Sequence, residues 1–334
     1  MNKLRAAVIG CGSIGSSMQD SAGAESRGIC THAAAYIHHP QTELVAFCDT
    51  NTRNLNQATD RWGNDISAHN DLESLLNAQK PQLVSVATHV DSHFEITKTC
   101  LEAPSVKGIL LEKPISNELQ EARELAALSA KLNKVLNVNY SRRFPPVFRK
   151  VAQDLQAEKW GKPVQVTGFY TKGLIHNGTH WLDLFRMLFG EPTVANAVAK
   201  LNLSNTGQGQ HMDPMLSFQM GNDLVPKADI HAFPVDAHTV FEMDVMLTRG
   251  RLRFVDQTDT IEVYVVKPDH PFVGYQALDL ATTHRFCLRD FVAHGIDDLV
   301  ASVNHSTKSA SPISSAIRNI ELATQIIDSY SPAS

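Results

Sequence analysis

The sequence lacks the long apolar segments of membrane and exported proteins. No part of it approaches the run of about 18 apolar residues that a membrane-spanning helix needs. Near the start, Lys3 and Arg5 precede only the short apolar run of residues 6–9 before glycine follows, which is too short for a signal peptide. These absences predict a cytoplasmic protein with no membrane partner.

Cysteine is scarce, and its placement excludes a disulfide framework. The number of cysteines, 5, is odd, and no two of them form a Cys-x-x-Cys pair. They are Cys11, Cys30, Cys48, Cys100 and Cys287. This usage also predicts a reducing, cytoplasmic setting.

Long runs of one charge are absent as well. Lys and Arg number 30 and Asp and Glu 35, a net charge of −5, and no block of about five like charges occurs. This excludes the basic arm of a nucleic-acid-binding protein. With 43% apolar and 19% charged residues the composition is that of an ordinary globular protein, and 334 residues predict two domains.

Short apolar runs alternate with helical patterns over residues 1–140. The runs are residues 5–9, 43–48, 83–87, 108–111 and 135–138. Between the last two, residues 117–131 repeat leucine and alanine at helical spacing. Such alternation predicts a parallel sheet whose right-handed crossovers place helices on both faces. Residues 1–140 are therefore predicted to form a doubly wound α/β domain.

The pattern changes after Pro145 and Pro146. One helix is predicted at residues 179–188, and alternating segments then follow without helices between them, at 194–201, 223–230, 240–247, 251–255 and 260–266. Successive strands of this kind pair antiparallel, with Arg249-Gly250 as one hairpin turn. Helices at 284–303 and 313–327 close the chain, and whether they pack back on the first domain stays open. Residues 141–334 are predicted to form an α+β domain with an open-faced, mostly antiparallel sheet and helices on one face.

An open sheet face needs a cover, because large exposed apolar patches are uncommon on monomers. We therefore expect a homodimer or homotetramer that pairs through this C-terminal sheet. The alternative is a polar outer face, for which the sequence offers Arg251, Arg253, Glu262 and Lys267.

A glycine motif follows the first predicted strand. Its residues are Gly10, Cys11, Gly12, Ser13, Ile14 and Gly15, in the pattern Gly-x-Gly-x-x-Gly. In such a motif the first glycine makes the turn, the second lets the backbone approach a pyrophosphate, and the third eases helix packing. A helix N-terminus after the loop favours the phosphate charge. The motif predicts a bound dinucleotide.

Asp49 ends the second predicted strand and bears on the choice of cofactor. It lies 34 residues beyond Gly15, more than the usual interval of about 20. The polar residues 16–30 form the surplus, as a loop before the helix resumes at residues 31–36. A carboxylate at Asp49 binds ribose hydroxyls and repels a 2′-phosphate, which favours NAD over NADP, and Arg53 weakens that preference. The alternative is that Asp49 only caps the helix that follows.

Glu112-Lys113-Pro114 follows the apolar run of residues 108–111. This places it at the carboxyl edge of the sheet, where doubly wound proteins bind ligands. Pro114 keeps Lys113 out of the helical backbone region. Lys113 is either a site residue or a solvated side chain, and its immediate sequence does not decide between the two.

Five motifs occur in order along the chain. They are Gly-x-Gly-x-x-Gly with Asp49; Val86-Ala87-Thr88 followed by His93; Glu112-Lys113-Pro114; Asn139-Tyr140-Ser141-Arg142-Arg143-Phe144; and Gly178-Thr179-His180-Trp181-Leu182-Asp183. Together they resemble the Gfo/Idh/MocA oxidoreductases, the glucose-fructose oxidoreductase and inositol dehydrogenase family. The resemblance implies a Rossmann domain that binds a nicotinamide cofactor, an open-faced sheet domain, and a sugar, cyclitol or related polyol as substrate, free or nucleotide-linked.

The resemblance also implies that Lys113 and His180 face the substrate hydroxyl that reacts. With the motifs above, the predicted cofactor contacts are Gly10, Gly12, Ser13, Ile14, Gly15, Asp49, Arg53, Thr88, His93, Glu112 and Lys113. Oxidising an alcohol sends a hydride to the nicotinamide and a proton to a base, and Lys113 and His180 divide this work. Which of them carries the proton stays open.

Two positions depart from the family pattern. His176 stands four residues before His180, where the family commonly has Asp, and His89 stands where it usually has Pro. Either His176 or Asn177 contacts a substrate hydroxyl, or the substrate differs. Tyr140 and Arg142 are further candidates for substrate binding, and for Arg142 the alternative is a solvated side chain or a salt bridge.

Two histidine pairs, His89 with His93 and His176 with His180, have i, i+4 spacing but no Cys or clear carboxylate beside them, so no metal is predicted. The predicted function is NAD-dependent hydride transfer to or from a secondary alcohol. The alternatives on the same fold are a glycoside hydrolase that retains its NAD and oxidises the sugar transiently, and a sensor without turnover.

Overall fold

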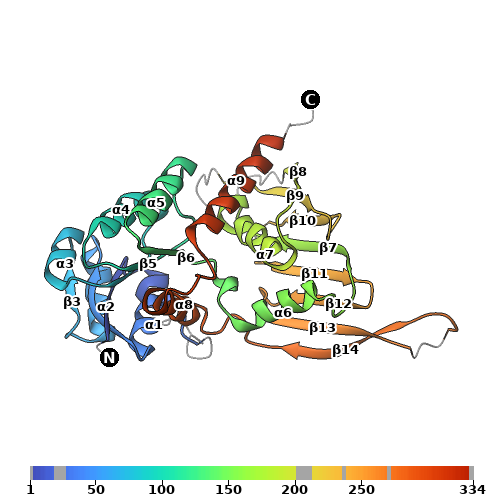
Figure 1. Cartoon of the computed structure of the whole chain (residues 1–334), viewed down its shortest axis with the longest axis horizontal. Coiled ribbons are helices and arrows are strands. Elements are labelled where there is room, and N and C mark those ends of the chain that lie inside the picture. Colours follow the sequence, from blue (N-terminus) through green and yellow to red (C-terminus); the bar gives the residue numbers. More distant parts are fainter. Residues whose placement is uncertain (1–2, 19–27, 201–212, 235–237, 269–271, 331–334) are drawn as a thin grey trace. The chain divides into compact units, whose positions relative to one another are not determined.

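The computed structural model describes residues 3–18, 28–200, 213–234, 238–268 and 272–330. The chain divides into two compact units, one of residues 1–144 with 289–317 and the other of residues 145–288 with 318–334. Each unit has its own sheet (Figure 1). Each also has its own hydrophobic core. Within the described ranges, no helix is both long and apolar enough to cross a membrane.

Six parallel strands form the sheet of the first unit, in the order β3-β2-β1-β4-β5-β6. They are β1 Leu4–Ile9, β2 Thr42–Cys48, β3 Ser67–His69, β4 Leu83–Val86, β5 Gly108–Leu111 and β6 Val135–Val138. The order reverses at β1, which lies between β2 and β4, so the predicted doubly wound sheet is confirmed. The edge strand β3 was not predicted, because its 3 residues are too few to show an alternation.

Helices cover both faces of this sheet. They are α1 His32–His38, α2 Thr52–Trp62, α3 Leu72–Gln79, α4 His93–Glu102, α5 Leu119–Lys131 and α8 Phe291–His305. The pair α1 and α8 packs on one face, and the pair α4 and α5 on the other (Figure 1). The first three begin at polar side chains, since Thr31, Asn51 and Asp71 each accept a backbone N–H of the first turn.

The helix α8 comes from far along the chain and lies directly on β5. A Cβ added at Gly108 would lie 2.7 Å from the side chain of Val303 and 3.0 Å from that of Leu299. On the helix side, a Cβ at Gly295 would lie 3.3 Å from Leu110. The two glycines thus let α8 and β5 approach closely, and β5 is the strand that leads to Lys113.

Eight strands form the sheet of the second unit, in the order β14-β13-β12-β11-β7-β10-β9-β8. They are β7 Pro163–Tyr170, β8 Val194–Lys200, β9 Leu216–Gly221, β10 Ala228–Ala232, β11 Phe241–Leu247, β12 Gly250–Val255, β13 Thr260–Lys267 and β14 Ala277–His284. Neighbouring strands pair antiparallel except β7 and β10, which are parallel. A helix follows β7, and such a crossover permits a parallel pair. The mostly antiparallel sheet is confirmed.

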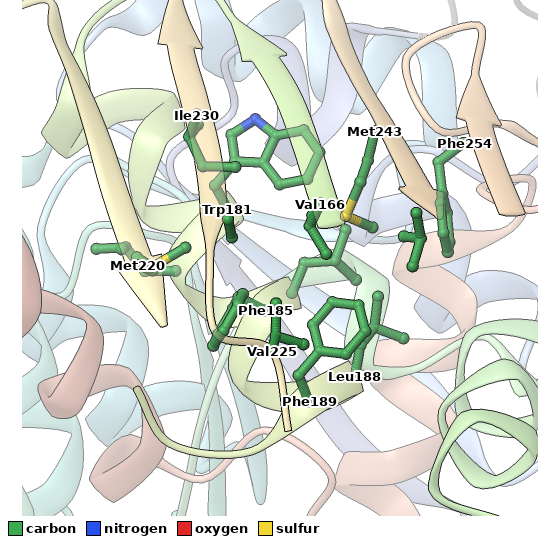
Figure 2. Packing of buried hydrophobic residues seen from close by; sticks show 14 of the residues in the cluster. Val166, Trp181, Phe185, Leu188, Phe189, Met220, Val225, Ile230, Met243 and Phe254 are labelled. Carbon is green, nitrogen blue, oxygen red and sulfur yellow. The ribbon is translucent and has the colours of Figure 1, made fainter. Parts of the chain in front are cut away.

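The core of the second unit lies between this sheet and α7 Thr179–Phe189 (Figure 2). Figure 2 shows Trp181, Phe185, Leu188 and Phe189 of α7 together with Val166, Met220, Ile230, Met243 and Phe254 of the strands. Trp181 is fully buried, its ring centroid lies 4.6 Å from that of Phe241, and its Nε1 donates to the carbonyl of Phe169 at 3.1 Å. The first turn of α7 is therefore fixed on the sheet. The remaining α-helices of the described residues are α6 Pro146–Gln156 and α9 Ile313–Ser329.

Two predicted segments are wrong in part. The helix predicted at 284–303 begins only at Phe291, because residues 277–284 form β14 and because Phe286 and Asp290 have positive φ values of 58° and 60°. The strand predicted at 223–230 begins at Ala228, because Asn222 Oδ1 accepts the N–H groups of residues 224 and 225 in a turn. The last residue of the strand predicted at 194–201 lies outside the described residues.

The outer face of the second sheet is mixed. Ion pairs join Arg251 to Asp244 and Arg253 to Glu262 across neighbouring strands. Apolar side chains are exposed on the same sheet, with Phe169, Met246 and Val198 at 40%, 42% and 52% of their surface. The face is thus neither strictly polar nor wholly apolar.

Candidate active site

The carboxyl edge of the parallel sheet brings the predicted cofactor residues together. Because adjacent parallel strands end at the same edge, the loops after β1, β2, β4, β5 and β6 all lie there. In that order they carry the glycine motif, Asp49, Thr88, Lys113 and Tyr140. The neighbours β1 and β4 flank the point where the strand order reverses, which is the usual ligand site of such sheets.

The three glycines of the motif have different surroundings. Gly10 has a φ of +91°, and a Cβ there would lie 2.5 Å from the carbonyl oxygen of Ala87. A Cβ at Gly15 would lie 1.9 Å from the carbonyl oxygen of Gly10. A Cβ at Gly12, in contrast, would meet no described atom within 4 Å. Packing of the loop requires Gly10 and Gly15, whereas Gly12 leaves open space of the kind that a pyrophosphate contact needs.

The loop continues into a single π-helical turn, Ser13–Ser17, with the N–H of Ser16 bonded to the carbonyl of Gly12 at 2.9 Å. Of the predicted surplus loop 16–30, residues 19–27 lie outside the described residues. The main helix α1 resumes at His32, capped by Thr31, as the sequence predicts.

Asp49 connects β2 to the glycine loop. Its Oδ2 accepts the backbone N–H of Cys11 at 2.7 Å, and its Oδ1 accepts that of Asn51 at 2.8 Å. The cap of α2 is Asn51, which accepts the N–H groups of Arg53 and Asn54, so the alternative that Asp49 caps this helix is wrong. The side chain of Arg53 is exposed on the first turn of α2. Burial, and then the charge of Asp49, raise the pKa of the Cys11 thiol, which keeps this thiol protonated.

Glu112 is the centre of a buried hydrogen-bond network next to Lys113. Its Oε1 accepts Nδ2 of Asn139 at 2.6 Å and lies 3.0 Å from Nε2 of His32. The side chain of Glu112 is 13% exposed and that of His32 is fully buried. Burial alone would raise the pKa of the Glu112 carboxyl, but the bonds from His32 and Asn139 outweigh it and the pKa is lowered. A fixed carboxylate therefore joins the start of α1 to the ends of β5 and β6.

His93, the first residue of α4, ties two loops of the edge together. Its Nδ1 lies 2.8 Å from the carbonyl oxygen of Pro114, and its Nε2 lies 3.0 Å from that of Thr88. His93 is 1% exposed, as a packing residue is, whereas His89, four residues before it, is exposed. In the described ranges, no group of three or more His, Cys, Asp or Glu side chains is arranged to hold a metal ion.

The other candidates of the first unit differ in exposure. Lys113 is partly exposed, and its peptide bond to Pro114 is cis. Tyr140 and Arg142 are buried, with 1% and 8% of their surface exposed, so Arg142 is not a solvated side chain. Nη1 of the neighbouring Arg143 lies 3.4 Å from the carbonyl oxygen of Ala310.

In the second unit, the predicted catalytic histidine lies in the first turn of α7. The residues before it, Leu174–Gly178, form one π-helical turn, and the ring of His180 lies 6.1 Å from that of Phe241. His176 is exposed on this turn, and Nδ2 of Asn177 donates to the carbonyl of Thr171 at 2.9 Å. His176, Asn177 and His180 thus lie on successive turns of one segment.

Three contributors to these sites were not among the predicted site residues, namely His32, Asn139 and Asp213. Asp213 accepts the backbone N–H groups of Ile175 and His176, each at 2.7 Å. Asn139 follows β6 much as Asp49 follows β2, and this position is a signal that could have found it. His32 and Asp213 had no such signal, because their partners lie 80 and 37 or more residues away in the sequence.

Comparison with known proteins supports the assignment from motifs. Residues 4–140 match the family model for the Gfo/Idh/MocA oxidoreductase family with an NAD-binding Rossmann fold. The chain is 35% identical over 137 residues to the uncharacterized oxidoreductase YhhX of Escherichia coli. This aligned region covers 36% of this chain and 39% of YhhX. The chain is also 27% identical over 252 residues to D-glucoside 3-dehydrogenase of the same organism. This second aligned region covers 68% of this chain and 67% of D-glucoside 3-dehydrogenase. The match spans well under half of the length of YhhX. The family model and these relatives confirm the predicted resemblance to the Gfo/Idh/MocA family.

A solved structure has the same fold over nearly the whole chain. An oxidoreductase from Agrobacterium radiobacter, in complex with NAD+, L-tartaric acid and magnesium, superposes with a TM-score of 0.75 and 14% sequence identity. The match covers 98% of this chain and 96% of that one. At such low identity the similarity establishes the fold alone, a Rossmann-type parallel sheet followed by a mostly antiparallel one.

We predict that Glu112→Gln weakens the folded state in a pH-dependent way. Because the pKa of Glu112 is lowered in the folded chain, its ionisation stabilises the fold above the unfolded pKa of about 4.3, and this contribution is lost as the pH falls through the folded pKa. The difference in unfolding free energy should be about 1.5 to 3 kcal/mol at neutral pH and should narrow in acid.

Urea unfolding of both proteins, from neutral pH to about pH 3, measures this difference. Glu124→Gln is the control, because Glu124 pairs with Lys98 at the surface, and it should cost less than about 1 kcal/mol at every pH. A difference for Glu112→Gln that stays constant with pH would show that this side chain acts through packing and not through its charge.

Proposed function

Because residues 4–140 carry the NAD-binding Rossmann fold of the Gfo/Idh/MocA oxidoreductases, we propose that this protein is an NAD-dependent oxidoreductase. It transfers a hydride between the nicotinamide and a secondary hydroxyl or keto group of a sugar, cyclitol or nucleotide-sugar. The observation that carries the proposal is the position of the glycine loop, Asp49 and Lys113 at one edge of the parallel sheet. Sheets of this kind bind dinucleotides there.

The residues of this edge fit a dinucleotide. The open space at Gly12 admits a pyrophosphate to the backbone, and Asp49 presents a partly exposed carboxylate beside the same loop. The bound nicotinamide would supply the hydride acceptor, and the residues of the chain hold the substrate and move its proton. Asp49 favours NAD because its charge repels the 2′-phosphate of NADP, while Arg53 acts in the opposite direction.

We assign the proton chemistry to Lys113 and His180. A base must take the hydroxyl proton of the alcohol, and a cation beside the oxygen stabilises its developing charge. Lys113 directly follows Glu112, which Asn139 and His32 fix. His180 directly precedes Trp181, which anchors α7 on its sheet. Both candidates therefore lie directly next to a residue that hydrogen bonds hold in place, as positioned acid–base groups require.

A sugar substrate is supported by the name of one relative, D-glucoside 3-dehydrogenase. Tyr140, Arg142, His176 and Asn177 are the proposed contacts to its hydroxyl groups. A hydrolase that retains its NAD would use the same residues, and net formation of NADH distinguishes the dehydrogenase from it. A sensor would bind the cofactor and react with no sugar.

The deciding experiment follows NADH formation from NAD+ with D-glucose, methyl D-glucosides and myo-inositol. We expect oxidation of at least one of these compounds. Lys113→Ala and His180→Asn should still bind NAD+ and lose about a hundredfold or more in turnover, because each removes a positioned proton-transfer or oxygen-holding group.

Lys98→Ala serves as the control, since Lys98 makes a surface ion pair with Glu124 and should leave turnover unchanged. Turnover within a fewfold of wild type in Lys113→Ala would remove Lys113 from the mechanism. No reaction with any sugar, together with tight NAD+ binding, would favour the sensor.

For the cofactor, we predict that the wild type binds NADH more tightly than NADPH and that Asp49→Asn narrows this preference. The variant retains an acceptor oxygen for the glycine loop but loses the charge, which weakens NADH binding by about 1.5 to 3 kcal/mol. Fluorescence titration of both cofactors measures the change. Asp71→Asn, at the cap of α3, is the control, and tighter binding of NADPH than NADH by the wild type would refute the preference.

We further propose a homodimer or homotetramer through the second sheet. The exposed Phe169, Met246 and Val198 support this, because they place apolar surface among the ion pairs of its outer face. Light scattering on the eluted protein should give twice or four times the mass of 36.8 kDa. Phe169→Asp should lower that mass, and a monomeric wild type would contradict the proposal.

A further inference from the structure

The segment that leads to His180 is held at its start by residues from a distant part of the chain. The first three N–H groups of the turn Leu174–Gly178 all find acceptors there. The N–H of Leu174 donates to the carbonyl of Pro214 at 2.9 Å, and those of Ile175 and His176 donate to the two carboxylate oxygens of Asp213 at 2.7 Å each. The carboxylate of Asp213 and the carbonyl of Pro214 thus accept all three of these N–H groups.

The backbone before the turn is shaped around this carboxylate. Gly173 has a φ of +88°, and a Cβ there would lie 2.5 Å from both Cγ and Oδ2 of Asp213. No other residue type fits at Gly173 unless the carboxylate moves. The close approach and the two short bonds therefore describe a single arrangement, which we call the Asp213 clamp.

The clamp places the half-buried carboxylate of Asp213 near the buried Tyr170. Burial raises the pKa of the Tyr170 hydroxyl, and the charge of Asp213 raises it further. The Tyr170 hydroxyl donates to the carbonyl of Leu216 at 2.7 Å, and this bond holds the chain shortly after Asp213. The bonds from Asp213 to the turn and the bond from Tyr170 to Leu216 therefore fix the position of the clamp relative to β7.

The clamp is connected to His180 through the helix backbone. The turn runs directly into α7, which has no side-chain cap of its own, and Thr179 Oγ1 donates to the carbonyl of Ile175 at 2.8 Å. The turn therefore holds the backbone on the N-terminal side of His180, while Trp181 holds it on the C-terminal side. His180 lies in that first turn.

We propose that Asp213 is the positioning residue of His180: its carboxylate holds the turn Leu174–Gly178 in the one orientation that directs the imidazole for proton transfer. The proposal rests on the proposed function only in taking His180 as a proton-transfer residue. Asp213 itself binds backbone N–H groups and takes no part in the transfer.

Asp213→Asn tests the clamp with almost no change of shape. The amide has one acceptor oxygen, so its NH2 group faces the N–H of Ile175 or His176, and one short bond becomes a repulsive contact. We expect about a tenfold to hundredfold fall in kcat, because a small displacement of a catalytic group has effects of that size. The Kd for NAD+ should stay within about twofold, since the proposed cofactor residues lie in the other unit.

The matched control is Asp259→Asn. Asp259 also accepts a backbone N–H, that of Leu288, at 2.7 Å in the same unit, but it lies in the turn between β12 and β13. Asp259→Asn makes the same chemical change but retains an acceptor oxygen for its one N–H, so its melting temperature should fall no more than that of Asp213→Asn. Only Asp213→Asn should lose turnover, and equal losses in the two variants would overturn the proposal.

A second variant disturbs the Asp213 clamp from the backbone of Gly173 and leaves the carboxylate itself unchanged. Gly173→Ala forces a methyl group onto the carboxylate, so its effect on kcat should pass through Asp213. In the double variant with Asp213→Asn the two losses should then not add, and kcat should equal that of the poorer single variant within about twofold. Multiplying losses would show that the two residues act independently, against the proposal.

A readout without substrate separates this proposal from the proposed function. Histidine labelled with carbon-13 at Cε1 gives one NMR signal for each of the 15 histidines, and the His180 signal is identified by its loss in His180→Asn. We expect this signal to move or split in Asp213→Asn and to stay unchanged in Asp259→Asn. An unchanged His180 signal in Asp213→Asn overturns the proposal, even if a sugar is oxidised. If no sugar is oxidised, the proposed function fails and the NMR comparison still decides the role of Asp213.

Discussion

The structure of the candidate site depends on carboxylates that bind groups of the fold itself. Asp49 accepts the backbone N–H of Cys11 in the glycine loop, Glu112 accepts Asn139 and contacts His32, and Asp213 accepts two N–H groups before α7. A buried or half-buried carboxylate without such donors would cost several kcal/mol, so each of them fixes the loop around it. In every case the fixed loop carries a residue of the proposed chemistry or lies next to one.

This arrangement separates the residues that hold the site from those that are proposed to react. Glu112 and Lys113 are neighbours, yet the carboxylate is turned to buried partners while the lysine stays partly exposed. The glycine loop shows the same division, because packing explains Gly10 and Gly15, whereas a Cβ at Gly12 would meet no described atom within 4 Å. A residue with no structural explanation at a ligand edge is the better candidate for ligand contact, since the fold alone does not require it.

The sequence predicts those parts of the molecule that local patterns control. The strands β1, β4, β5 and β6 are short apolar runs, and α7 and α9 follow the 3.6-residue period, so they are found with nearly the right bounds. Local patterns fail where the partner is remote or the pattern is weak. Most of β14 is exposed on both sides and shows no alternation, and the partners of His32 and Asp213 are set only by the folded chain. Motifs thus make Lys113 and His180 candidates, but they do not reveal the groups that hold the neighbouring backbone in place.

The clamp also bears on the histidine at position 176. The two bonds from Asp213 to the turn go to the backbone N–H groups of residues 175 and 176, so these bonds can form with other side chains at position 176. That side chain is exposed, one helical turn before His180. An acidic residue at position 176 is therefore not needed to fix the turn, because Asp213 supplies a carboxylate from another part of the chain. With the proposed substrate contact of His176, a substitution at position 176 should change specificity more than it changes the fold.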